Sequence, residues 1–179
     1  MENKPNNFLK HTLSYGSLTG GGLILFSLVM YSIDINMQNP LMYLAFLLLA
    51  IGIFFGIISY RDNYLGGFIS YGKCIAVGVM ISLFASILLA IYSYLFFTFF
   101  DQSAIRKIMD LAEENMVKKG MTEEQIEMAM KYTTKFMTPI WMSAINILSY
   151  TFWGTIIALI LGIFTKKTDP SFEGHFKQD

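Results

Sequence analysis

Residues 74–100 read CIAVGVMISLFASILLAIYSYLFFTFF, which is 27 residues without a single Asp, Glu, Lys or Arg. An α-helix rises about 1.5 Å per residue and the hydrocarbon core of a bilayer is about 30 Å thick, so roughly 20 apolar residues are enough to cross it. This stretch exceeds that length. It therefore predicts a membrane helix that tilts or extends into the headgroup layer.

Three further stretches also lack charged residues, and they cover 13–33, 41–60 and 136–165. Their lengths of 21, 20 and 30 residues each reach the length needed for one crossing. The first is longer than the apolar region of a secretory signal and lacks a cleavage site, so we expect it to be retained as a span. The sequence predicts an all-α fold, a four-helix transmembrane bundle, with 1–179 forming a single membrane domain.

The overall composition excludes several other classes of protein. Hydrophobic residues make up 54% of the chain and charged residues 15%, against roughly 25% charged residues in soluble domains. The 13 basic and 13 acidic residues balance, which leaves no electrostatic case for nucleic-acid binding. A single cysteine, Cys74, cannot form an intrachain disulfide bond.

The segment 101–135 is rich in charge and has the alternation of water-exposed amphipathic helices. Gly120 fits the stop that follows a helix, and Thr122 with Gln125 fits a capping box that starts another. We expect an extramembrane helical hairpin between the third and fourth spans. Its methionine-rich faces leave two interpretations open, a solvated cap or a docking surface for a partner protein.

Each expected span carries small residues four positions apart, the spacing that lets membrane helices approach closely. This pattern predicts close packing within one chain, with a dimer seam as the alternative. The candidate packing residues are Gly16, Gly20, Gly52, Gly56, Gly78, Ser82, Gly154, Ala158 and Gly162.

A polar cluster surrounds the connection between the second and third spans. Arg61 and Lys73 suit a phosphate group, so the cluster is a candidate contact for lipid headgroups. The alternative is interfacial anchoring, with a local salt bridge from Arg61 to Asp62 or to another acid. The members of the cluster are Tyr60, Arg61, Asp62, Asn63, Tyr71 and Lys73.

Catalytic and metal-binding patterns of the HExxH, GxSxG, CxxC and Walker types are missing from the sequence. His11 and His175 are assigned to the two tails. We therefore expect a protein without enzymatic activity, catalytic residues, cofactor or metal. The expected function is a non-catalytic membrane module that binds lipid or a protein partner, including a second copy. The alternative is a small oligomeric transporter or channel subunit.

Basic residues near the span ends predict the orientation in the membrane. The side that holds both termini carries 7 Lys and Arg residues and the opposite side carries 6. This difference is too small to determine the orientation. The first span is more informative, because Lys4 and Lys10 precede it and no basic residue lies in 34–40. The positive-inside rule then places both termini in the cytoplasm.

Several of these segments also occur together in a known family. They are the Gly16-xxx-Gly20 span, the connector from Tyr60-Arg61-Asp62 to Gly66-Gly67-Phe68-Ile69-Ser70-Tyr71-Gly72, a third span from near Gly78, the hairpin sequence Gly120 to Glu127, and a fourth span ending in Lys166-Lys167. With this combination the chain resembles the small bacterial membrane proteins catalogued as domain of unknown function 4199. The resemblance covers roughly Phe8 to Lys167. It implies a multi-pass inner-membrane protein with four spans and carries over no catalytic residues.

Overall fold

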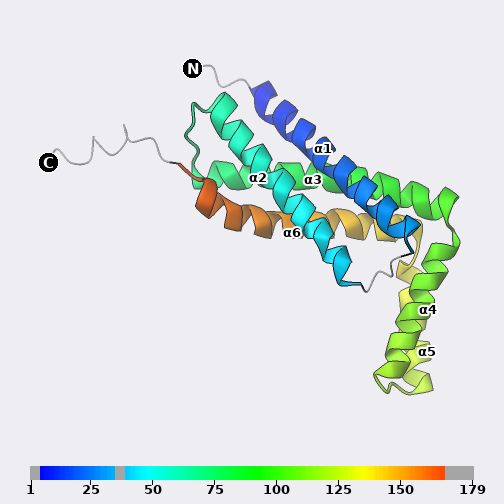
Figure 1. Cartoon of the computed structure of the whole chain (residues 1–179). Helices are drawn as coiled ribbons and strands as arrows, with labels where there is room; N and C mark the ends of the chain where they lie inside the picture. Colours follow the sequence, from blue (N-terminus) through cyan, green and yellow to red (C-terminus); the bar gives the residue numbers. More distant parts are fainter. Residues whose placement is uncertain (1–4, 35–38, 168–179) are drawn as a thin grey trace. The chain divides into compact units, whose positions relative to one another are not determined.

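The structure, a computed structural model, describes residues 5–34 and 39–167 (Figure 1). Within these ranges the chain is helical and forms no strand, so the predicted all-α fold is confirmed. Two short irregular helices adjoin the long ones, a 3-10 helix before α2 and a π-helix after α3. The elements are α1 (Pro5–Ser32), η1 (Pro40–Tyr43), α2 (Leu44–Tyr64), α3 (Tyr71–Leu95), η2 (Phe96–Phe100), α4 (Ser103–Lys118), α5 (Glu123–Phe136) and α6 (Pro139–Thr165).

Four helical segments of the described chain are long and apolar enough to cross a membrane, at 7–32, 40–64, 71–100 and 139–165. Their outward surfaces are also apolar: Leu18 is 74% exposed and Phe164 is 78% exposed. Exposing such side chains to water costs about 25 cal/mol per Å², whereas hydrocarbon accepts a helix that is apolar all round. The predicted four spans are confirmed, and the protein is a membrane protein.

The helices that form the first and last spans, α1 and α6, begin at prolines rather than where the uncharged stretches begin. The helix α1 starts at Pro5, ahead of the expected start of the span at residue 13, and α6 starts at Pro139 rather than at residue 136. Proline is favoured at the first position of a helix because its missing N–H group has no helical partner there. The charged Lys10 does not stop α1 because it lies on an exposed position.

The described chain divides into two compact units. One consists of the residues up to Leu88 together with those from Leu148 onward, and the other is Leu89–Ile147. The first unit contains α1, α2 and most of α3 and α6. The second contains α4 and α5 with the adjoining ends of α3 and α6.

Antiparallel helix pairs build the first unit (Figure 1). In the pair α1 and α2, His11 reaches the carbonyl oxygen of Gly56, and Thr19 lies against Gly52. In the pair α3 and α6, Ser82 lies against Gly154, and its neighbour one turn away, Gly78, lies against Ala158. The side chains at the centre of this packing are inaccessible to solvent, and they include Leu49, Ile53, Ile57, Val77 and Ile81.

In the second unit, the turn between α4 and α5 has the predicted start and stop signals. Gly120 adopts φ +74°, and the Met121 N–H donates to the Met116 carbonyl oxygen at 3.2 Å, which closes the end of α4. The Thr122 N–H donates to Gln125 Oε1 at 3.0 Å, and the Gln125 N–H donates to Thr122 Oγ1 at 3.4 Å. The predicted capping box is confirmed.

Candidate functional site

The predicted polar cluster lies at one end of the first unit, where four helix ends meet. The helices α1 and α3 begin at this end, and α2 and α6 finish there (Figure 1). The ring of Phe8 in α1 packs edge-on against Tyr60 in α2, with ring centroids 5.7 Å apart. Arg61 Nη1 donates to the carbonyl oxygen of Thr165 in α6 at 3.5 Å. Residues from widely separated segments therefore form one site.

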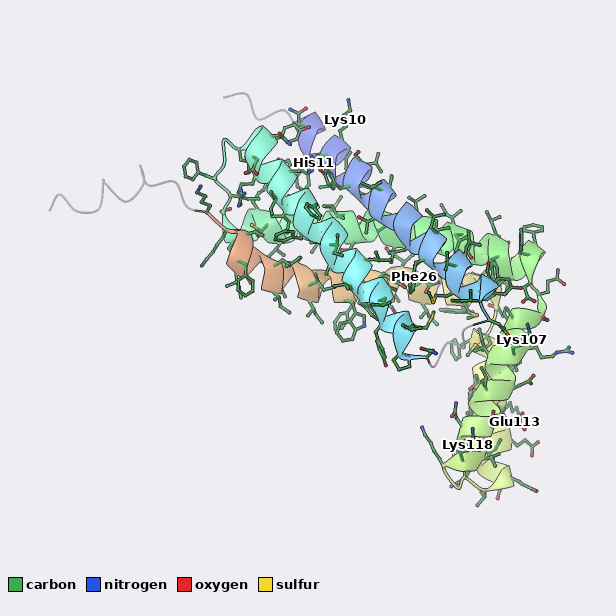
Figure 2. All side chains as sticks on the ribbon, viewed as in Figure 1. Lys10, His11, Phe26, Lys107, Glu113 and Lys118 are labelled. Atoms are coloured by element: carbon green, nitrogen blue, oxygen red, sulfur yellow. The ribbon has the colours of Figure 1, made fainter. Side chains whose placement is uncertain are left out.

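A buried histidine lies beneath this site. His11 is 6% exposed, and its Nε2 lies 2.9 Å from the Gly56 carbonyl oxygen, so Nε2 carries the hydrogen and donates it. The imidazole contacts Tyr15, Tyr60 and Tyr64, with centroid distances of 4.7, 5.2 and 5.3 Å. Figure 2 shows His11 on the side of α1 that faces α2, and Lys10 pointing away from it.

The assignment of His11 to a tail is therefore wrong, because α1 starts eight residues earlier than the uncharged stretch. One sequence signal could have revealed it. His11 and Tyr15 are four residues apart, as are Tyr60 and Tyr64, and this is the spacing of neighbours on one helix face. His175 lies outside the described residues.

Arg61 and Asp62 form the local salt bridge that the sequence offered as one interpretation. Arg61 Nε lies 2.7 Å from Asp62 Oδ1, and Nη2 lies 3.3 Å from Oδ2, so the contact is bidentate. The Arg61 side chain is 23% exposed and also holds the end of α6 through Thr165. Arg61 is therefore mainly a connecting residue, and its charge is largely balanced.

Lys73 at the start of α3 has an aromatic environment instead of an acidic partner. Its Nζ atom lies 4.5 Å from the centroid of the Phe8 ring and 5.8 Å from that of Tyr60. These distances suit cation–π contacts. In the part of the chain that the structure describes, Lys73 forms no ion pair. Its charge is thus held in place, and none of the described acids neutralises it.

The connector 65–70 fastens the end of α6 to the site. Gly66 and Gly67 adopt φ values of +63° and +87°, in the left-handed region that favours glycine. The backbone N–H groups of Ile69 and Lys167 each donate to the other residue's carbonyl oxygen, at 2.9 and 3.0 Å. Lys167 Nζ then lies 5.7 Å from the Phe68 ring centroid. This bridge holds the last two lysines of the described chain beside the α3 start.

Among the described residues, the charges at this end of the unit are predominantly positive. We call the five cationic residues Lys10, Arg61, Lys73, Lys166 and Lys167 the basic end. The described residues at this end contain one acid, Asp62, whereas the described part of the connection at the opposite end holds Asp34 and no basic residue. Lys10, Lys166 and Lys167 are exposed. The arrangement can attract and hold an anion.

Two of the predicted cluster residues, Tyr71 and Asn63, already form hydrogen bonds within the protein. Tyr71 donates its hydroxyl hydrogen to the Leu159 carbonyl oxygen at 3.2 Å, and its ring lies against Gly162 of α6. Asn63 Nδ2 donates to Ser59 Oγ at 3.0 Å within α2. Their contacts are within the protein, so the lysines are the better candidates to meet a ligand.

The candidate packing residues lie where helices of the first unit meet. Ser82 and Ala158 are fully buried. For the glycines, an added Cβ would crowd a neighbouring helix, as small-residue packing requires. The neighbours are Phe84 for Gly16, Ala85 for Gly20, Thr19 for Gly52, Ile81 for Gly56, Ala158 for Gly78, Ser82 for Gly154 and Tyr71 for Gly162.

Metal coordination finds no support in residues 5–34 and 39–167. Metal sites in proteins are built from several His, Cys, Asp or Glu side chains that converge on one point. No group of three such residues lies together in these ranges. What these ranges show at the basic end is lysines held beside aromatic rings.

Comparison with known proteins shows which family the chain matches. The model of the family described as "Protein of unknown function (DUF4199)" matches residues 14–167. The match includes four of the five residues of the basic end, all except Lys10. No curated protein and no solved structure matches the chain.

Proposed function

The chain belongs to the DUF4199 family of proteins of unknown function, and from that premise we propose that it is a non-catalytic membrane protein that binds anionic phospholipid headgroups at its basic end. A phospholipid headgroup offers a phosphate at the depth where the helix ends lie. Lysines near a membrane surface attract anionic lipids by about 1 kcal/mol each. The occupant of the site is therefore a component of the surrounding bilayer.

The observation that carries this proposal is the unbalanced charge of the basic end. Among the described residues, five cationic residues from four helix ends stand against one acid, and Asp62 is already engaged by Arg61. Lys73 rests on Phe8 and Tyr60, which leaves its charge available to a phosphate. Tyrosine rings at the same level suit the headgroup layer, because a tyrosine side chain combines an apolar ring with a polar hydroxyl group.

The proposal also assigns an orientation and a membrane. We place the basic end at the cytoplasmic face of the bacterial inner membrane, so that both chain termini are cytoplasmic. Support comes from Lys4 ahead of the first span, from Lys10 near its start, and from the lack of basic residues in 34–40. The cytoplasmic leaflet is also the one whose surface is negatively charged.

The test compares lipids that remain bound to the full chain. The protein is placed in nanodiscs of equal parts phosphatidylglycerol and phosphatidylcholine, and retained lipid is measured by native mass spectrometry. We expect preferential retention of phosphatidylglycerol by the parent chain. The double variant Lys166→Gln/Lys167→Gln removes two charges and keeps the backbone bridge to Ile69. It should weaken retention by about 2 kcal/mol, roughly thirty-fold.

The matched control changes two exposed lysines elsewhere. Lys118→Gln/Lys119→Gln in the hairpin removes the same charge but lies outside the basic end. We expect this control to retain phosphatidylglycerol like the parent chain. Equal retention of both lipids by the parent chain, or an equal loss in both double variants, would reject headgroup binding at this site.

A further inference from the structure

The helix α5 carries two apolar stripes, and only one of them packs against α4. Ile126, Ala129, Met130 and Thr133 are half-buried on the side where α4 and α5 pack together. A second stripe consists of Met128, Tyr132 and Phe136, which are 58%, 61% and 51% exposed. These three residues are four apart and therefore lie on one face of the helix. We call them the outer stripe.

The partner helix α4 has no comparable surface. Its exposed positions are mostly charged, as Glu113 and Lys107 illustrate (Figure 2), and Val117 is its only large hydrophobic residue that is strongly exposed among the described residues. The hairpin is thus charged along the outside of one helix and apolar along part of the other. A hairpin that served only as a solvated cap would not require the outer stripe.

Lysines flank the outer stripe. Lys131 and Lys135 lie on the adjoining face of α5, and Lys135 Nζ is 5.9 Å from the centroid of the Tyr132 ring. The acidic residues of α5 are confined to its first half, at Glu123, Glu124 and Glu127. An aromatic and methionine stripe beside lysines is the pattern of helices that lie in the headgroup layer.

The short connection between α5 and α6 places this stripe close to the start of a membrane span. Phe136 ends α5, and Pro139 begins the span-forming helix α6 only three residues later. The rings of Phe136 and Trp141 touch, with centroids 5.5 Å apart. Trp141 lies in the first turn of the span, the level at which tryptophan prefers the boundary between lipid and water. The last turn of α5 is therefore tied to the same level.

From these contacts we infer that α5 is an interfacial helix, with the outer stripe of Met128, Tyr132 and Phe136 inserted into the headgroup layer of the bilayer. The occupant of this apolar face is the lipid surface. Lys131 and Lys135 reach from its edge to lipid phosphates. This inference concerns residues of the second unit and does not depend on headgroup binding at the basic end.

A fluorescent label on the full chain tests this inference. Cys74 is fully buried, so the parent chain should take up no thiol-reactive label and serves as a blank. An environment-sensitive dye is attached at Tyr132→Cys or, as the matched control on α4, at Glu113→Cys. Each protein is reconstituted at one copy per nanodisc, with or without lipids that carry a nitroxide near the headgroup.

We expect the dye at position 132 to emit at shorter wavelength than the dye at position 113 and to lose intensity when nitroxide lipids are present. Water-like emission at both positions, without quenching, would overturn the inference. Emission at short wavelength that appears only with two copies per disc and is not quenched by the lipid nitroxide would also overturn it, because the stripe would then cover a second protein.

The outcome is checked without a label by hydrogen exchange in nanodiscs. The variant Tyr132→Asp places a charge in the outer stripe. Faster exchange of the α5 amides in this variant, with unchanged exchange in the spans, is expected for a helix that leaves the lipid surface. Unchanged exchange in α5 would argue against insertion.

Discussion

At the scale of single residues, two glycines of α1 show how a missing side chain determines helix contact. A Cβ built on Gly16 would lie 2.5 Å from the Cβ of Phe84 and 3.0 Å from the carbonyl oxygen of Ile81. Both of those atoms are fixed to the backbone of α3, so neither can yield without moving the helix. A Cβ on Gly22 of the same helix would meet nothing within 4 Å.

We therefore expect Gly16→Ala to lower the free energy of unfolding by about 1–3 kcal/mol, as overpacking does in a close-packed interior. Gly22→Ala should leave stability unchanged or raise it by up to about 1 kcal/mol, because alanine has the higher helix propensity. Thermal unfolding of the full chain in detergent measures both effects. Equal losses in the two variants would contradict the packing of α1 on α3.

At the scale of elements, the turn between α4 and α5 depends on local signals alone. The left-handed Gly120 ends one helix, and the Thr122 and Gln125 side chains exchange hydrogen bonds with the backbone to begin the next. Both helices are exposed along much of their length and bury no residue completely. The cap therefore contributes local stability at the start of α5.

Thr122→Ala should destabilise the start of α5 by about 1 kcal/mol, because the Gln125 N–H loses its acceptor. Hydrogen exchange resolved by segment is the suitable measurement, since the change is local. We expect faster exchange at the first turn of α5 and unchanged exchange in α2 and α3. Thr122→Ser keeps the hydroxyl oxygen and should behave like the parent chain, so faster exchange in that variant would speak against the cap as the cause.

At the scale of the whole molecule, the orientation that we propose has both chain ends on the cytoplasmic side, because four spans give an even number of crossings. The basic end collects the start of α1 and the end of α6. Positive charge near the first span favours the cytoplasm for that side. The orientation that we propose is therefore accessible to a direct measurement.

Alkaline phosphatase, which is active only outside the cytoplasm, should be inactive when fused after Asp179 and active when inserted after Gly120 in the turn of the hairpin. The physical reason is the count of crossings that separates the two positions, four before the first and three before the second. A green fluorescent protein fused after Asp179 provides the complementary readout. Phosphatase activity after Asp179 would reverse the orientation.

Much of the architecture can be predicted from the sequence. An uncharged stretch of twenty or more residues has one stable form in lipid, a helix whose backbone N–H and C=O groups bond to one another. The hairpin turn was equally readable, since Gly120 and Thr122 act on their immediate neighbours. The residues at which the helices begin and end are harder to predict from the sequence. A charge such as Lys10 ends an uncharged stretch but does not end a helix, so the eight extra residues of α1 were missed.

Only the tertiary structure decided which side chains meet. His11 reaches the Gly56 carbonyl oxygen, 45 residues away, and Arg61 reaches that of Thr165, 104 residues away. The composition of an apolar helix does not specify its partners, because lipid and neighbouring helices are equally apolar and association depends on the fit of small residues. The lysines were visible as single charges in the sequence, and the meeting of four helix ends made them one basic site.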